Sequence, residues 1–259
     1  MAPAAGFTAT VHNDRLLLAD ESNAFIVEGA VYVDVVRVVS GGVSLEDLPS
    51  LLHDYSLDEI RAAIVHLANV GFLRPTLGSN FPERDAWWES ASIEKARRSL
   101  ELRTLCSEGA AMLRQALESV DLSIDEGADL FVVTTDDYLR PELADINRRG
   151  NPWLLAKPVG HTIFLGPLFV PRRTACWECM AWWLRAFRWR QSAFHGWRKD
   201  EYPPQPSIAC LPATLAIAAG MIATASAIIT ARGTHEELEN AILAFDTRTL
   251  RLSRHEVNP

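Results

Sequence analysis

The sequence predicts an α+β domain followed by a larger α/β domain, and two observations predict this order. In the first 78 residues, short apolar runs between polar turn residues give way to apolar residues at helical spacing. From Leu100 onward, strand-like runs alternate with helix-like segments, which is typical of a parallel sheet covered by helices. A chain of 259 residues is long enough to bury the cores of both domains.

The first predicted domain, residues 1–78, begins with strands and continues with helices. Apolar runs at 7–11, 15–19 and 24–28 are separated by polar residues and predict a three-stranded meander. Valines then recur at helical spacing over 31–39, up to Gly41 and Gly42.

Two serines are expected to begin the next two helices of this domain. Ser44 and Ser56 are each followed three residues later by an acidic residue, Asp47 or Glu59, in the pattern of a capping box. Three strands followed by three helices predict a winged-helix-like unit.

Residues 79–92 are polar and are expected to form a linker, which leaves 93–259 as the second domain. The predicted order of its first elements, strand, helix, strand, helix and strand, implies a doubly wound parallel sheet. The expected elements are strands at 100–106, 129–134 and 153–159, helices at 108–119, 141–149 and 178–190, a loop at 191–207, an apolar helix at 211–231 and a closing hairpin at 241–255.

The apolar helix and the N-terminus bear on the compartment. Residues 211–231 carry no charge and are long enough to span a membrane, but they are rich in Ala, Thr, Ser and Gly, so a buried helix is favoured. The N-terminus lacks the features of a signal peptide, and four cysteines do not make a disulfide framework in a chain of this length. We therefore expect a cytoplasmic protein that does not span or bind a membrane.

The signals for nucleotide binding and catalysis are weak. The turn after the first strand of the second domain, 106–109, has one glycine and places Glu108 where a phosphate would lie, so we expect no ATP on this chain. Asp136 and Asp137 follow the next strand, either as ligands or as an N-cap with acidic charge for the following helix. Because motifs of catalytic nucleophiles are absent and Cys106 is expected to be buried, no catalytic residue is assigned.

Charge distinguishes between two uses of the first domain. Residues 1–85 contain five Arg, no Lys and twelve Asp or Glu, a net charge of −7, which opposes DNA binding by a winged-helix transcription factor. The alternative is capture of an extended peptide along a strand edge. The residues expected to bind it are Ala24, Phe25, Ile26, Val27 and Glu28 on the strand, and Ile60, Arg61, Ile64 and Leu67 on the third helix.

A Cys-x-x-Cys pair, Cys176 and Cys179, has the spacing that lets two thiolates hold one tetrahedral zinc. Zinc needs four ligands, and this motif supplies half of them. Cys106 or Cys210 could add to it only if the fold brings them near. The alternative also stays open: the two cysteines are reduced thiols at the start of the helix predicted at 178–190, which is rich in aromatic residues.

The aromatic helix mixes tryptophan with arginine, which is the composition of energetic centres in protein interfaces. We expect contact there with a second copy of the chain or with an enzyme partner; the alternative is core tryptophans beside a solvated basic face. The residues concerned are Trp182, Trp183, Arg185, Arg188 and Trp189.

Three stretches carry a resemblance to a known family. They are T-D-D-Y-L at 135–139, P-W-L-L-x-K-P-V-G at 152–160, and G-P-L-F-x-P at 166–171 with the C-W-E-C that follows. With the two-domain layout they resemble the ThiF-like, ubiquitin-activating-enzyme-like partner proteins of YcaO cyclodehydratases. That family acts in the biosynthesis of ribosomal peptides with thiazole and oxazole rings, and the resemblance covers nearly the whole chain.

The resemblance implies that the first domain is a recognition element that binds the leader of a precursor peptide beside residues 24–28 and against the third helix. The second domain is then a degenerate adenylating fold that scaffolds and activates a YcaO enzyme, fused or separate, without catalysing chemistry itself. An active ATP-dependent adenylating enzyme of the same fold is the alternative. Fused members carry a second Cys-x-x-Cys after the closing hairpin, where this sequence ends at Pro259, so structural zinc and the extent of the chain both stay open.

Overall fold

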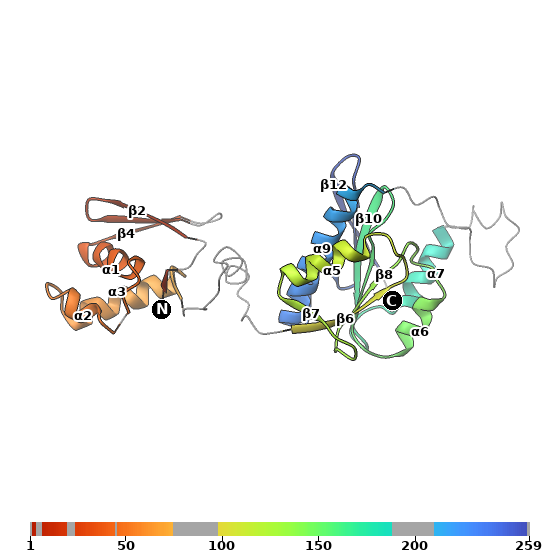
Figure 1. Ribbon diagram of the computed structural model, residues 1–259, viewed down its shortest axis with the longest axis horizontal. Helices are drawn as coiled ribbons and strands as arrows, with labels where there is room; N and C mark the ends of the chain where they lie inside the picture. Colours follow the sequence, from red (N-terminus) through yellow and green to blue (C-terminus); the bar gives the residue numbers. More distant parts are fainter. Residues whose placement is uncertain are drawn as a thin grey trace, which may run out of the picture. The chain divides into compact units, whose positions relative to one another are not determined.

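The computed structural model describes residues 2–3, 7–19, 24–44, 46–74, 98–187 and 210–257. The chain divides into two compact units, Met1–Lys95 and Ala96–Pro259, each with its own core (Figure 1). The predicted linker at 79–92 and the loop at 191–207 lie outside the described residues.

In the first unit an antiparallel sheet is followed by helices. The sheet has the order β2-β3-β4, so β2 and β4 are its edges. A second, short pair joins β1 to β5 and was not predicted. The elements are β1 (Ala2–Pro3), β2 (Thr8–His12), β3 (Arg15–Ala19), β4 (Ala24–Glu28), α1 (Ala30–Ser40), α2 (Leu48–Leu51), α3 (Leu57–Asn69) and β5 (Leu73–Arg74).

The core of this unit forms where one face of the sheet meets the helices. Alternate strand residues point inward while their neighbours stay exposed, which is the period of a half-buried sheet. The inward strand residues pack against apolar residues of the three helices. The strands contribute Leu16, Leu18 and Val27, and the helices contribute Val35, Val39, Leu48, Ile60 and Leu67.

One predicted cap is confirmed and the other is wrong. Ser56 and Glu59 form the expected capping box at the start of α3. Ser44 caps no helix, because α2 begins at Leu48. Pro49 explains the difference: a helix starting after Ser44 would place this proline in its interior, where its missing N–H and its ring break the helix.

The second unit is built on a seven-stranded mixed sheet of order β12-β11-β10-β9-β8-β6-β7. Strands β7, β6, β8 and β9 are parallel, whereas β9 to β12 pair antiparallel. The strands are β6 (Arg98–Thr104), β7 (Leu122–Ile124), β8 (Phe131–Thr134), β9 (Trp153–Lys157), β10 (Thr162–Phe169), β11 (Ala241–Asp246) and β12 (Arg251–Glu256).

The strands predicted at 100–106, 129–134 and 153–159 are β6, β8 and β9, and they pair in parallel as expected. The sheet is mixed because β10, which was not predicted, pairs antiparallel with β9. Only four residues, 158–161, join β9 to β10, and so short a connection allows an antiparallel pair alone. Gly166 and Pro167 obscured β10 in the sequence, and the β9–β10 register shifts between Leu165 and Leu168. The closing hairpin of β11 and β12 forms as predicted.

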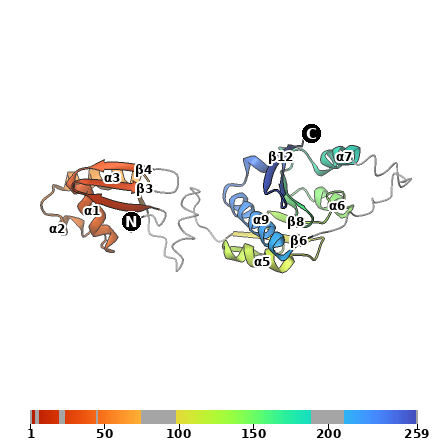
Figure 2. The same ribbon diagram turned by 90° about the horizontal axis from the view of Figure 1, so that it is seen from above.

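Helices cover both faces of the sheet (Figures 1 and 2). The helices α5 (Ala110–Ser119) and α9 (Pro212–Arg232) pack together on one face, and α6 (Glu142–Arg148) and α7 (Trp177–Phe187) on the other. Among the described helices α9 alone is long and apolar enough to cross a membrane by length and composition. It packs against α5, β6 and β10, as a core helix does.

Candidate functional site

Strand β4 offers an edge to which a peptide can add. Within the described sheet it pairs with β3 alone. The side chain of Val27 lies in the core, whereas Ile26 is 69% exposed on the outer face, opposite Leu17 of β3. Of the other strand residues predicted to bind peptide, Phe25 is half-buried, and Ala24 and Glu28 are exposed.

The helix residues predicted to face the peptide divide into two groups. Ile60 and Leu67 are 2% and 0% exposed and belong to the core, so they do not form an open wall. Ile64 is half-buried and Arg61 is exposed. Val65, which was not predicted to contact the peptide, is 58% exposed on the same helix. The available signal was that Val65 is apolar but lies outside the periodic face that 60, 63 and 67 define.

The two thiols of the Cys-x-x-Cys motif lie together at the start of α7. The sulfur atoms of Cys176 and Cys179 are 3.5 Å apart. Two sulfurs bound to one tetrahedral zinc at about 2.3 Å are roughly 3.8 Å apart, so the pair fits two of its four ligand positions. Within the described ranges no three His, Cys, Asp or Glu residues form a group that could hold a metal ion, so neither Cys106 nor Cys210 adds to the pair there.

Helix α7 has a buried face and an exposed face. Trp177 is buried and its indole Nε1 donates a hydrogen bond to the Tyr138 carbonyl at 2.9 Å. Trp182 and Trp183 are 64% and 43% exposed, and Arg185 is exposed. Arg188 and Trp189, the other predicted interface residues, lie outside the described residues.

A cavity of about 470 Å³ lies beside α7. Its size falls within the usual range for ligand pockets, and its walls are mainly apolar. The ammonium of Lys157 lies 5.0 Å from the centre of the Phe164 ring and donates to the carbonyls of Val159 and Thr162. The lining includes Tyr138, Lys157, Phe164, Met180, Trp183 and Ile242.

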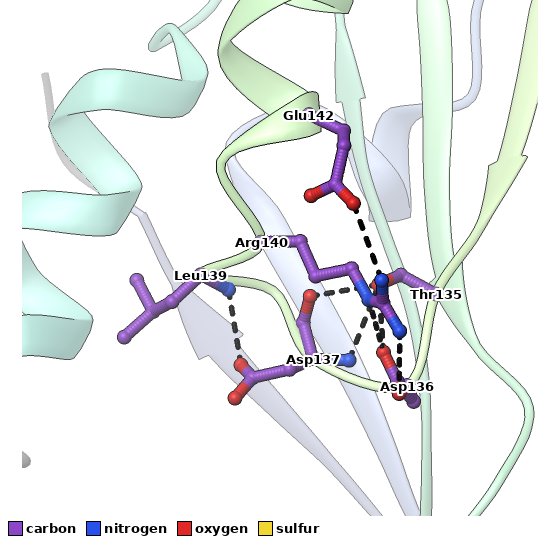
Figure 3. A network of polar contacts seen from close by, with 6 residues as sticks. All are labelled: Thr135, Asp136, Asp137, Leu139, Arg140 and Glu142. Atoms are coloured by element: carbon purple, nitrogen blue, oxygen red, sulfur yellow. Dashed lines mark hydrogen bonds and ion pairs between the residues drawn. The ribbon is translucent and has the colours of Figure 1, made fainter. Parts of the chain in front are cut away.

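The acidic pair after β8 is held by a polar network (Figure 3). The guanidinium of Arg140 donates two hydrogen bonds to the Asp136 carboxylate, at 2.6 and 2.9 Å. The Asp137 carboxylate accepts a hydrogen bond from the Leu139 amide. Helix α6 begins at Glu142, so the expectation that this pair forms an N-cap is wrong. The two carboxylates shape the loop before the helix.

Little space remains at the carboxyl ends of β6 and β8, where α/β folds hold nucleotides. The cavity between described residues there is about 10 Å³, far below the roughly 300 Å³ of a small-molecule pocket. The side chain of Leu215 on α9 fills this region. It lies so close to Gly109 that a Cβ added there would come within 3.2 Å of its Cδ2 atom.

Cys106 lies at this end of the sheet and is buried. Its burial, with the nearby Asp136 carboxylate, raises the pKa of its thiol to about 11. A thiol with this pKa is protonated near neutral pH, which makes it a poor nucleophile.

Comparison with known proteins supports this fold. No protein-family model matches the chain, and no curated protein sequence matches it. A heterocyclase solved with substrate and cofactor is 27% identical over 99% of this chain, with a TM-score of 0.85. The heterocyclase TruD is 28% identical over 98% of it, with a TM-score of 0.82.

The chain spans 38% and 41% of the length of these two heterocyclases. MccB of E. coli, solved with MccA, is 11% identical with a TM-score of 0.61; the match covers 99% of this chain and 96% of MccB. The likeness to MccB concerns the fold alone and is consistent with the predicted ThiF-like architecture. The chain thus has a fold related to those of heterocyclases, over nearly its whole length.

Proposed function

We propose that this protein binds the leader of a ribosomal precursor peptide and presents the peptide to a YcaO cyclodehydratase that forms thiazoline or oxazoline rings. The observation that carries the proposal is the match of 99% of the chain to a heterocyclase solved with substrate. The chain corresponds to about two-fifths of that protein. In this proposal the ring-forming chemistry belongs to a further polypeptide or domain. The first unit is the leader-recognition element, the second is the scaffold, and both work in the cytoplasm.

The edge of β4 supports peptide binding by strand addition. A leader peptide lying beside β4 would form main-chain hydrogen bonds with it and place alternate side chains on each face of the sheet. Arg61 and Val65 of α3 supply exposed contacts, whereas Ile60 and Leu67 support the helix from the core. The filled nucleotide end of the second unit supports a role without ATP on this chain.

Binding is tested by fluorescence anisotropy of a labelled leader peptide from a candidate ribosomal precursor of the same organism. We expect saturable binding that Ile26→Asp and Val65→Asp each weaken about tenfold or more, a cost of roughly 1.4 kcal/mol. Thr10→Asp is the matched control, because Thr10 is exposed and lies opposite Leu17 on the same face as Ile26, but on β2, the opposite edge. Equal weakening by all three variants, or by none, would refute binding at β4.

We further propose that Cys176 and Cys179 supply two thiolate ligands to a structural zinc ion. Two more ligands must come from elsewhere, since thiolates in structural sites hold zinc as part of a set of four. Protein purified without chelator should contain zinc by mass spectrometry, and the paired substitution Cys176→Ser with Cys179→Ser should remove it. Cys106→Ser is the control and should leave the zinc content unchanged. Retention of zinc by the paired variant would contradict the proposal.

A further inference from the structure

The 470 Å³ cavity beside α7 has a buried floor and an exposed rim. Its lining residues come from α7, from the strands β9 to β12 and from the loop after β8, so it lies within the second unit alone. Tyr138, Met180 and Ile242 are buried at its floor, whereas Trp183 and Glu256 are exposed at its rim. A cavity of this size that opens to solvent can admit a small molecule.

Two aromatic rings form a corner of this cavity. The rings of Tyr138 and Phe164 lie 5.7 Å apart and are inclined at 59°. The Tyr138 hydroxyl donates a hydrogen bond to the Gly166 carbonyl at 2.6 Å, so the protein satisfies this polar group and holds the ring in place. Rings fixed in this way offer apolar area to a flat ligand at little cost in side-chain ordering.

One side chain beside this corner carries a positive charge. The ammonium of Lys157 lies 5.0 Å from the centre of the Phe164 ring and donates to two backbone carbonyls, at 2.7 and 3.2 Å. These neutral groups hold the ammonium in place without cancelling its charge. The acid at the rim, Glu256, forms an ion pair with Arg254 at 3.0 Å. A half-buried cation beside apolar walls favours a ligand with a negative end.

We propose that this cavity binds a small aromatic carboxylate, with its ring in the corner of Tyr138 and Phe164 and its carboxylate toward Lys157. The corner and the ammonium are adjacent, so a ring and a carboxylate joined by a short link reach both. The chain has a net charge of −8, which repels anions in general. A preference for an anion over a neutral compound of the same shape therefore reports a local cation. This inference does not depend on leader binding, which involves the first unit.

Calorimetric titration of the full chain with the carboxylate indoleacetate and its uncharged amide, indoleacetamide, tests this assignment. We expect the carboxylate to bind with a Kd of about 0.1 mM or below, and about tenfold more tightly than the amide. Lys157→Met should remove that preference, whereas Lys157→Arg, which keeps the charge, should retain it. Arg114→Met is the control and should leave both affinities unchanged, because Arg114 is exposed on α5, which covers the other face of the sheet.

A cavity-filling variant tests the place of binding. Leu184 is a half-buried residue of the cavity wall, so Leu184→Trp should fill part of the space and weaken both probes about tenfold or more. Circular dichroism shows whether each variant is folded. The comparison of the two probes on the unaltered chain needs no variant, so the inference stays testable if one of them fails to fold.

Four outcomes would overturn the inference. They are equal affinity for the two probes, no binding of either probe up to about 1 mM, a preference that survives in folded Lys157→Met, and affinities that folded Leu184→Trp leaves unchanged. Anisotropy with the leader peptide separates this inference from the proposed function. Lys157→Met should bind the leader normally, and Ile26→Asp should bind indoleacetate normally, so either proposal can fail alone.

Discussion

At the scale of single residues, the acidic pair after β8 shows how a candidate ligand site became structural. Asp136 is 5% exposed, and the Arg140 guanidinium holds it with two short hydrogen bonds (Figure 3). The hydrogen bonds to Asp136 raise the pKa of Arg140. An aspartate at this end of a sheet suits a nucleotide or metal, but here a fixed cation occupies its oxygens.

Replacing Asp136 tests that structural role. Asp136→Asn should lower the free energy of unfolding by about 2 to 3 kcal/mol, because the half-buried guanidinium loses its counter-charge while water reaches it only in part. Asp145→Asn is the control: its ion pair with Arg148 is exposed, so chemical denaturation should show no measurable change. A stability loss as large in the control as in Asp136→Asn would contradict this account.

At the scale of elements, the caps show which features were visible in the sequence. The capping box at Ser56 is local, since two residues three apart contain the whole signal, and it forms as predicted. The cap at Ser44 failed because Pro49, five residues on, sets where the helix can begin. Strand β10 was missed because Gly166 and Pro167 interrupt its apolar run, and because its pairing with β9 and β11 is not encoded in its own residues.

The two serines give a paired prediction. Ser56→Ala should destabilise the first unit by about 1 kcal/mol, because it leaves the Glu59 amide at the start of α3 without its acceptor. Ser44→Ala should cost clearly less, since among the described residues its hydroxyl accepts the Glu46 amide, at 3.3 Å, in an exposed turn and caps no helix. Thermal or urea unfolding of both variants measures the difference. Equal losses would mean that the Ser44 turn is as important as a helix cap.

At the scale of the whole molecule, composition and patterning predicted two domains and the helix layers of the second, but not the residues that its surfaces offer. Periodicity identifies Ile60 and Leu67 as one apolar face, yet a peptide groove and a core give the same pattern. Burial in the structure assigns both residues to the core. For the same reason the sequence could not show that Trp177 is internal while Trp182, five residues on, is exposed.

Because each unit has its own core, the two should unfold as separate cooperative transitions. Ile60 is 2% exposed, so Ile60→Asp places a carboxylate among apolar side chains. The cost of burying this charge exceeds the free energy of unfolding of a small domain. Calorimetry should then show the transition of the first unit abolished and that of the second unchanged. Ile26→Asp, on the exposed face of the same unit, should keep both transitions. Loss of both transitions in Ile60→Asp would show that the second unit folds only with the first. In that case the two units would form one cooperative structure, and any loss of peptide binding in a destabilised variant would have to be separated from a loss of folding.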